Sequence, residues 1–357
     1  MTEGSWDSDE LRRRISSELD GFLQARQADL SFMQTEGRAL LEALRDFTLG
    51  GGKRLRPIFV YWGFRAGGGE EDCPEIVRAS LATELLHAFA LIHDDIMDAS
   101  DTRRGRPTAH RAFEAMAQEA GFRGDASAFG LGAGILLGDL AFAWADAALV
   151  ESGFSPERLA GAFRVFNTMR TELMGGQYLD LLVAARGRAG VEDVRRVAAY
   201  KSAKYTVERP LHLGLALAGG DPALAERLTA YGLPLGEGFQ LRDDVLGVFG
   251  QPTLTGKPSG DDLREGKQTA LVALARGRAT GEVARLLDER VGARDLTENE
   301  VEALRQAIVD TGALEATEQR ITSLAAESRT SLASLGLPAP VHAALDALVT
   351  DLCFRQS

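Results

Sequence analysis

The segment of residues 85–98 constrains the fold more than any other part of the chain. It is an apolar run that ends in three carboxylates, Asp94, Asp95 and Asp98. On a helix that turns roughly 100° per residue, Asp94 and Asp98 point the same way and Asp95 lies about one turn from Asp98. An acidic end of a surface helix is the alternative reading, but acidic residues there oppose the helix dipole. The pattern favours a divalent cation, and Mg²⁺ is the usual one where phosphates complete its shell.

The composition is typical of a soluble globular protein. The 357 residues are 45% hydrophobic and 26% charged, with a formal net charge of −12, which argues against nucleic acid or an anionic membrane as the main partner. The two cysteines, Cys73 and Cys353, match no metal-binding or disulfide pattern, which suits a reducing compartment. We find no signal-peptide pattern and no uninterrupted apolar run of about 20 residues, so we expect a cytoplasmic protein without a transmembrane segment.

Helical periodicity recurs along the chain, and no alternating strand pattern of useful length is present. We therefore predict a flexible N-terminal tail at residues 1–10 and a single all-α domain at residues 11–357. The predicted helices cover residues 9–47, 57–65, 74–98, 109–120, 128–151, 156–180, 191–203, 205–218, 221–249, 263–277, 314–334 and 339–353. The segment from Thr297 to Glu300 has the pattern of a capping box, which predicts a further helix start.

A second acidic pair, Asp243 and Asp244, lies on the helix predicted for residues 221–249. Gln240 precedes Asp244 by one turn, so its amide and the carboxylate share a face. Taken alone, two acids on a surface helix would explain the pair equally well. The glycine-rich segment that follows contains Lys257 and Lys267, and glycine-rich backbone of this kind can approach a phosphate closely.

Basic residues stand beside the acidic motifs or beside helix breaks. Arginine suits bidentate phosphate recognition, and lysine serves as a point charge. Each of these residues alone would read as a solvated surface charge, but their coincidence with two acidic clusters indicates a diphosphate bound with a metal and room for a second anion. The residues are Lys53, Arg56, Arg103, Arg104, Lys201 and Lys257.

His87 lies two turns before Asp94, about 10 Å along the helix axis and on nearly the same stripe. That position favours a contact with the ligand over the usual role of a core histidine. His93 and His212 are read as core residues. The pattern of a Ser–His–Asp or Cys–His nucleophile is not evident in the sequence.

In this order, the motifs resemble those of the trans-isoprenyl diphosphate synthases, which form the polyprenyl synthetase family. The resemblance extends from about Gly50 to Lys267. A single DDxxD pattern would be weak support, but the ordered set is specific. The set comprises GGKRLRP at 51–57, His87 ahead of DDIMD at 94–98, RRG at 103–105, GQ at 176–177, KS at 201–202, FQLRDD at 239–244 and TGK at 255–257.

The resemblance implies a helical bundle around a central cavity, with the two aspartate motifs facing each other across its mouth, and a homodimer. It implies a Mg²⁺-dependent prenyltransferase that condenses isopentenyl diphosphate head to tail with dimethylallyl, geranyl or farnesyl diphosphate. It also implies three Mg²⁺ ions, with Mn²⁺ as a substitute. The expected product is linear geranylgeranyl diphosphate, with farnesyl diphosphate as the alternative.

Roles for individual residues are carried over from the matching positions. Asp94 and Asp98 would hold two metal ions and Asp243 the third, while Asp95 and Asp244 would support those shells. The residues implied for the allylic diphosphate are Arg103, Lys201, Ser202, Gln240 and Lys257. Those implied for isopentenyl diphosphate are Lys53, Arg56, His87 and Arg104, and Lys267 would lie near the closing mouth. The catalytic set is Asp94, Asp95, Asp98, Arg103, Lys201, Asp243, Asp244 and Lys257.

Two positions bear on details of the reaction. Gly247 stands where the family motif commonly has its third acid, and we expect activity to survive because the first two aspartates and the loop lysine are present. Phe89 and Ala90, five and four residues before Asp94, look like the chain-length determinant of geranylgeranyl diphosphate synthases. Ordinary core packing is the alternative role for Phe89.

Three other classes of protein are weighed against this reading. A class I terpene cyclase shares Mg²⁺ and an aspartate-rich helix, but it needs no second diphosphate site and leaves Lys53, Arg56 and His87 unexplained. A non-catalytic synthase-like regulatory subunit would be expected to lose aspartates or basic residues that this chain retains. A purely structural helical scaffold leaves the paired acidic and basic clusters without a cause.

Overall fold

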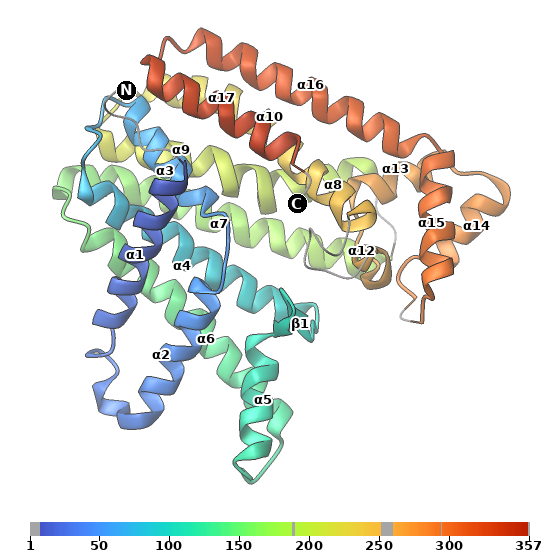
Figure 1. Ribbon diagram of the computed structural model, residues 1–357, viewed down its shortest axis with the longest axis horizontal. Coiled ribbons are helices and arrows are strands. Elements are labelled where there is room, and N and C mark those ends of the chain that lie inside the picture. The colour runs from blue at the N-terminus through green and yellow to red at the C-terminus, as the bar shows by residue number, and fades with distance from the viewer. Residues whose placement is uncertain (1–7, 188–189, 251–259, 294, 356–357) are drawn as a thin grey trace. The chain divides into compact units, whose positions relative to one another are not determined.

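The computed structural model describes residues 8–187, 190–250, 260–293 and 295–355 (Figure 1). Over these residues the all-α prediction is confirmed. The strands in the described part are β1 (Thr102–Arg103) and β2 (Arg106–Pro107), a two-residue antiparallel hairpin. Residues 1–7 of the predicted tail lie outside the described residues, and the first helix begins at Ser8.

The chain divides into two compact units, and each is described by itself. Unit 1 contains the chain up to Phe163 together with Leu213–Gly220, and unit 2 contains Arg164–His212 and the chain from Asp221 onward. The division does not test the prediction of a single domain for residues 11–357, which stays a prediction.

The helices of unit 1 precede and follow the first aspartate motif. They are α1 (Ser8–Ala25), η1 (Ser31–Met33), α2 (Gln34–Leu49), α3 (Leu55–Ala66), α4 (Pro74–Met97), α5 (Ala109–Glu119) and α6 (Ala126–Val150). The predicted helix over residues 9–47 is therefore interrupted after Ala25, and the three glycines from Gly50 separate α2 from α3.

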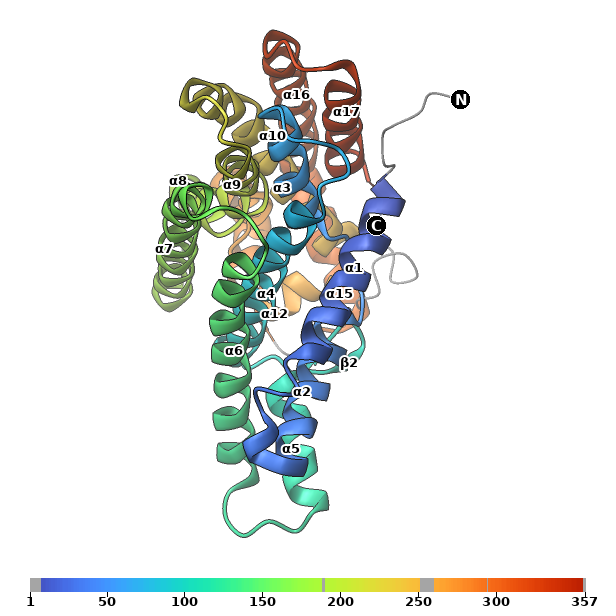
Figure 2. The same cartoon turned by 90° about the vertical axis from the view of Figure 1, so that its left-hand side faces the viewer.

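Helices α4 and α5 of unit 1 both pack on α6 (Figure 2). Glycines of α6 lie at these contacts. Gly130, Gly134 and Gly138 are spaced by four and share one face of the helix. A Cβ atom added at Gly138 would lie 2.3 Å from Nε2 of His93 on α4, and one at Gly130 would lie 2.4 Å from the carbonyl oxygen of His110 on α5. Side chains at these positions would push the helices apart, so the glycines allow α6 to pack directly on the helix that carries the aspartates.

Helices α4 and α6 are long and apolar enough, by length and composition, to cross a membrane. This differs from the expectation drawn from uninterrupted apolar runs. A core helix passes the same test, and 67% of the apolar stretch of α4 is buried, against 44% for α6. We therefore interpret α4 as a core helix. Helix α6 leaves apolar side chains exposed, including Ile135 and Leu136.

Unit 2 holds the second aspartate motif on its longest complete helix, α10. Helix α10 packs on α16 and on a π-helix labelled η2, and α16 runs beside α17 (Figure 1). The helices that lie wholly in this unit are α8 (Val191–Ala198), η2 (Ala199–Glu208), α10 (Pro222–Phe249), α12 (Asp261–Glu265), α13 (Ala270–Arg278), α14 (Gly281–Arg290), α15 (Glu298–Asp310), α16 (Ala313–Ser334) and α17 (Ala339–Cys353). Two more, α7 (Pro156–Arg186) and α9 (Arg209–Ala218), contribute residues to both units.

Several elements of unit 2 differ from the predicted boundaries. Residues 191–218 run as α8, η2 and α9, without the predicted break at Lys204. The helix predicted for residues 263–277 is wrong as a single element, because Gly266 ends α12 in a left-handed conformation. Helix α14 was not predicted. The capping box at Thr297 is confirmed, with the Thr297 side chain and the Glu300 side chain each bonded to the other residue's backbone amide.

Candidate active site

The first aspartate motif lies at the C-terminal end of α4, and a hairpin folds back to meet it. Arg104 and Gly105 both have positive φ, 53° and 72°, as the central residues of a type I′ turn do. The turn places β1 so that Arg103 binds the carboxylate of Asp95, with Nε 2.8 Å and 2.9 Å from its two oxygens and Nη2 2.7 Å from Oδ1. The sequence indicated a role for each residue but did not indicate this pair.

Asp95 is 1% exposed, so its charge must be compensated within the protein. Burial raises the pKa of the Asp95 carboxyl, and the Arg103 guanidinium opposes that rise. Both carboxylate oxygens of Asp95 therefore bind Arg103. This is consistent with the predicted role of Asp95 in supporting the metal shell. The same guanidinium lies 4.0 Å from Oδ2 of Asp94.

Asp94 and Asp98 are the residues of this motif that fit a metal ion. Asp94 is part-buried, Asp98 is exposed at the end of the helix, and its backbone amide donates to the carbonyl oxygen of Asp94 at 2.8 Å. Among the described residues, no group of three or more His, Cys, Asp or Glu side chains is arranged to hold a metal ion by itself. Mg²⁺ commonly takes one or two carboxylates and completes its shell with water and phosphate oxygens. The donor set therefore fits a metal site that a diphosphate completes.

A basic cluster surrounds His87 in unit 1. Burial, and then Arg56, Arg104, Arg103 and Arg54 in that order, holds the pKa of His87 well below its usual value. The imidazole is therefore neutral near pH 7, and it can offer a hydrogen bond but no charge. Arg103 and Arg54 are paired with the carboxylates of Asp95 and Glu84. The four arginines still give the cluster a net positive charge, which suits a phosphate group.

The glycine segment before α3 lies against this cluster. Gly51 and Gly52 have φ values of 126° and 124°, and Cβ atoms there would lie 3.5 Å and 3.6 Å from the guanidinium nitrogens of Arg104. Arg54 has a φ of 51°, and its Nη1 lies 2.6 Å from Oε2 of Glu84, both side chains being 6% exposed. This buried pair anchors the segment. Sequence reasoning gave Arg54 no role, although it stands inside the quoted motif.

The remaining predicted residues of unit 1 are placed as follows. Lys53 is exposed, and its carbonyl oxygen accepts a hydrogen bond from Nε of Arg12 at 3.2 Å. Phe89 and Ala90 are part-buried on α4, one turn or more before Asp94. The centroid of the Phe89 ring lies 4.9 Å from the centroid of the Phe142 ring on α6.

The second aspartate motif lies on α10 in unit 2. Oδ1 of Asp244 accepts a hydrogen bond from Nε2 of Gln240 at 2.8 Å, and Oδ2 accepts one from the backbone amide of Ala270 at 3.1 Å. Burial raises the pKa of Asp244 to about 7, and Asp262 adds to that rise. Both oxygens are thus engaged by the protein, and the predicted supporting role of Asp244 is consistent with this geometry.

Asp243 is 41% exposed and forms an ion pair with Arg355, beyond the end of α17. The Arg355 guanidinium carbon also lies 4.8 Å from the centre of the Phe239 ring, and burial lowers the pKa of Arg355 to about 10. Sequence reasoning gave Arg355 no role. No sequence signal connects residues more than a hundred positions apart, so only the folded chain reveals this pair.

Lys201 lies on the π-helix η2, and its Nζ is 2.7 Å from Oδ2 of Asp180 on α7. Two glycines allow the backbone of η2 to pack closely on its neighbours. A Cβ atom at Gly176 would lie 2.7 Å from the amide nitrogen of Lys201, and one at Gly236 would lie 2.5 Å from Cα of Ala203. Ser202 is part-buried between these two contacts. A π-helix often marks a functional position, and here it carries a predicted ligand of the diphosphate.

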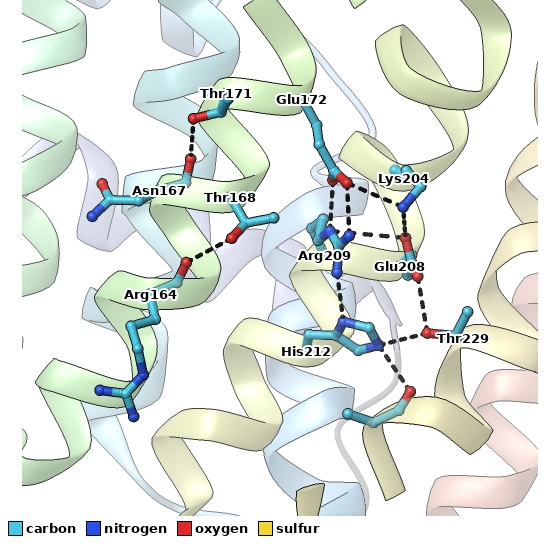
Figure 3. A network of polar contacts seen from close by, with 11 residues as sticks. Arg164, Asn167, Thr168, Thr171, Glu172, Lys204, Glu208, Arg209, His212 and Thr229 are labelled. Carbon is cyan, nitrogen blue, oxygen red and sulfur yellow. Dashed lines mark hydrogen bonds and ion pairs between the residues drawn. The ribbon is translucent and has the colours of Figure 1, made fainter. Parts of the chain in front are cut away.

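A part-buried polar network continues from η2 (Figure 3). Arg209 donates from Nε and Nη2 to the two carboxylate oxygens of Glu172, at 2.6 Å and 2.7 Å, and Lys204 lies 3.1 Å from Glu172. Thr229 of α10 donates to Glu208 at 2.9 Å. The network links α7, η2, α9 and α10, and so it stabilises the segment that presents Lys201.

Of the two lysines in the glycine-rich segment, the structure describes Lys267. Lys257 lies outside the described residues. Lys267 is 41% exposed and lies 3.2 Å from Asp262 and 2.8 Å from Glu265. Burial would lower the pKa of Lys267, but these two carboxylates outweigh it and raise that pKa.

Comparisons with known proteins agree with the motifs. Residues 38–308 match the family described as polyprenyl synthetase. A geranylfarnesyl diphosphate synthase of Aeropyrum pernix is 32% identical over 82% of this chain and 86% of that protein. A geranylgeranyl diphosphate synthase of Saccharolobus solfataricus is 32% identical over 78% of this chain and 79% of that protein.

A solved structure shows the same agreement in three dimensions. It is a geranylgeranyl pyrophosphate synthase from Corynebacterium glutamicum, complexed with isoprenyl diphosphate and magnesium. It is 41% identical, with a TM-score of 0.94, and the match covers 98% of this chain and 100% of that chain. The resemblance read from the motifs is confirmed: the chain belongs to the polyprenyl synthetase family.

Proposed function

We infer that the chain is a prenyltransferase that catalyses the Mg²⁺-dependent condensation of isopentenyl diphosphate with an allylic diphosphate, giving a linear trans-prenyl diphosphate. The observation that carries this function is the basic cluster around His87 beside the aspartates of α4. A site in which four arginines outnumber their paired carboxylates Glu84 and Asp95, next to a site that takes a metal, suits two diphosphates with different modes of binding. Family membership supports the same reaction.

The roles of the residues follow from their surroundings. Asp94, Asp98 and Asp243 are proposed to hold three Mg²⁺ ions, with Mn²⁺ as a substitute. Arg103, Lys201, Ser202, Gln240 and Lys257 are proposed to bind the allylic diphosphate. Lys53, Arg56, His87 and Arg104 are proposed to bind isopentenyl diphosphate, and Lys267 is proposed to lie near the mouth of the site as it closes.

When bound, Mg²⁺ neutralises the allylic diphosphate and polarises the carbon–oxygen bond that breaks. The arginine and lysine side chains hold both diphosphates so that the double bond of isopentenyl diphosphate reaches the allylic carbon. His87 donates a hydrogen bond to an anionic oxygen and stays neutral. The proton released after carbon–carbon bond formation goes to the departing diphosphate, so the protein needs no strong base of its own.

Phe89 is proposed to set the length of the product. It lies five residues before Asp94 on α4 and packs on Phe142. An aromatic residue at this place, followed by the small Ala90, supports geranylgeranyl diphosphate as the product, with farnesyl diphosphate as the alternative. The allylic substrate is then dimethylallyl, geranyl or farnesyl diphosphate.

We propose that the chain works as a cytoplasmic homodimer of one all-α domain per subunit. The support is on α6, where Leu131, Ile135 and Leu136 are 40%, 44% and 64% exposed. An apolar face of this kind on a helix marks an interaction surface, and a second copy of the chain offers a matching one.

The function is tested with purified protein, Mg²⁺, isopentenyl diphosphate and each allylic diphosphate in turn. We expect linear prenyl diphosphates, identified by chromatography after dephosphorylation, and no product when Mg²⁺ is chelated. A cyclic hydrocarbon from one allylic substrate alone would indicate a terpene cyclase. Absence of any product with every substrate would indicate a non-catalytic subunit.

A further inference from the structure

Gly247 occupies the position at which the family motif has its third acid. It lies one turn after Asp243 on α10, so a side chain there would point the same way as Asp243. That space is filled from elsewhere in the chain. A Cβ atom added at Gly247 would lie 1.9 Å from Oδ2 and 2.5 Å from Cγ of Asp262. These distances are far shorter than any van der Waals contact, so the Asp262 carboxylate takes the place of the missing side chain.

Asp262 belongs to α12, a five-residue helix bounded by two glycines. Gly260 and Gly266 have φ values of 73° and 70°, so both adopt the left-handed conformation that glycine tolerates. These turns bring α12 back onto α10. Asp262 is 8% exposed, and its carboxylate is directed at the helix that carries the aspartate motif.

The two oxygens of Asp262 have different surroundings. Oδ1 accepts a hydrogen bond from Nζ of Lys267 at 3.2 Å, and the backbone amide of Lys267 donates to the carbonyl oxygen of Asp262 at 3.0 Å. Oδ2 is the oxygen closest to the position of the absent Cβ, since Oδ1 lies 3.2 Å from it. Lys267 thus orients the carboxylate so that one oxygen is presented at residue 247.

A buried carboxylate is costly, and an apolar side chain could have filled the same space at lower cost. Its presence close to Asp244 and in the space at Gly247 calls for a use of the negative charge. We propose that Asp262 supplies the third carboxylate of the second aspartate motif from α12, and that residue 247 is glycine because Asp262 needs its space. Asp262 is thus a positioning residue for the metal shell built on Asp243.

This inference rests on the proposed function, because it concerns the magnesium–diphosphate site. The experiment measures the melting temperature of the full chain with saturating inorganic diphosphate while Mg²⁺ is titrated. Asp262→Asn keeps the shape and the acceptor for Lys267 but removes the charge. Loss of a group that supports metal ligands typically weakens metal affinity by about 10- to 100-fold, and we expect the half-maximal Mg²⁺ concentration to rise by this factor.

Two further variants separate the charge from its location. Gly247→Ala changes no charge, but its methyl group displaces the Asp262 carboxylate, so the same rise in Mg²⁺ requirement is expected. The double variant G247D/D262G moves the carboxylate from α12 to α10, and it is expected to return the Mg²⁺ requirement to the wild-type value. Glu265→Gln is the matched control, because it removes an equal charge from the other partner of Lys267 and leaves Gly247 untouched.

The outcomes are distinguishable. A wild-type Mg²⁺ response in Asp262→Asn overturns the inference, and so does failure of the double variant to recover while its circular dichroism remains that of a folded protein. A rise in Glu265→Gln equal to that in Asp262→Asn also overturns it, since Lys267 alone would then be responsible. If the wild type shows no Mg²⁺ response with diphosphate, the proposed function fails as well.

Discussion

The ammonium group of Lys201 lies 2.7 Å from the carboxylate of Asp180, so the cation that we assign to the allylic diphosphate is already oriented by the protein. The two side chains are 26% and 37% exposed, and a pair with this exposure contributes little to stability, about 0–1 kcal/mol. Its value is therefore in orientation, because a lysine side chain otherwise samples many rotamers.

Lys201→Met is expected to raise the KM for the allylic diphosphate by about 10- to 100-fold, the equivalent of a hydrogen bond to a charged group worth about 1.5–3 kcal/mol. The KM for isopentenyl diphosphate should change little. Lys204→Met is the control on the same π-helix, since Lys204 contacts Glu172 and Glu208 instead. It is expected to lower the melting temperature without a selective effect on the allylic KM. Steady-state kinetics with each substrate varied in turn measures the two KM values.

His212 makes folding stability depend on pH. A guanidinium group only donates hydrogen bonds, so Nδ1 of His212 accepts from Arg209 at 3.2 Å and Nε2 donates to the carbonyl oxygen of Ala225 at 2.9 Å. Burial lowers the pKa of His212; Glu208 opposes this shift and Arg209 adds to it. Protonation therefore favours the unfolded chain. The contribution of neutral His212 to folding stability is complete above the pKa of histidine in the unfolded chain, about 6.5. It is lost as the pH falls below that pKa.

We expect the melting temperature to fall between pH 7.5 and pH 5.5, and His212→Gln to reduce that fall. His87 and His110 also have lowered pKa values, so they retain part of the dependence. The same two proteins compared at pH 8, where the imidazole is neutral in both states, provide the reference. An equal pH dependence with and without His212 would contradict the assignment.

Phe89→Ala is expected to lengthen the prenyl products. The change removes the ring that packs on Phe142 and leaves room beyond Ala90 on the same helix. Chromatography of dephosphorylated products measures the effect. Phe154→Ala is the matched control, because Phe154 is also part-buried and also packs on an aromatic ring, that of Phe64. Unchanged product length in Phe89→Ala would show that Phe89 is ordinary core packing.

Arg355→Gln is expected to lower the Mg²⁺ concentration required for half-maximal activity. The Arg355 guanidinium pairs with Asp243 and so competes with a cation for that carboxylate. Because Asp243 is 41% exposed, the competing pair contributes about 0.2–1 kcal/mol, which corresponds to a change of less than about fivefold. Arg320→Gln, which breaks a comparable pair with Glu237 on α10, should leave the Mg²⁺ requirement unchanged.

Much of the helical architecture could be predicted because its signals are local. The N-cap at Asp221, the capping box at Thr297 and the proline at the start of α4 each act within one turn. The misplaced boundaries are those set by packing. The π-helix from Ala199 to Glu208 follows from close approach to Gly176 and Gly236, and neither glycine is near it in the sequence.

The candidate site divides in the same way. Residue types, their spacing on α4 and α10, and their order along the chain are properties of the sequence, and they were sufficient to recognise the family. Which carboxylate each cation contacts is decided by the tertiary structure. Asp180 beside Lys201, Arg355 beside Asp243, and Asp262 in the space at Gly247 each join segments brought together by packing. Side-chain contacts of this kind depend on ångström-scale distances between helices, and no local pattern encodes those distances.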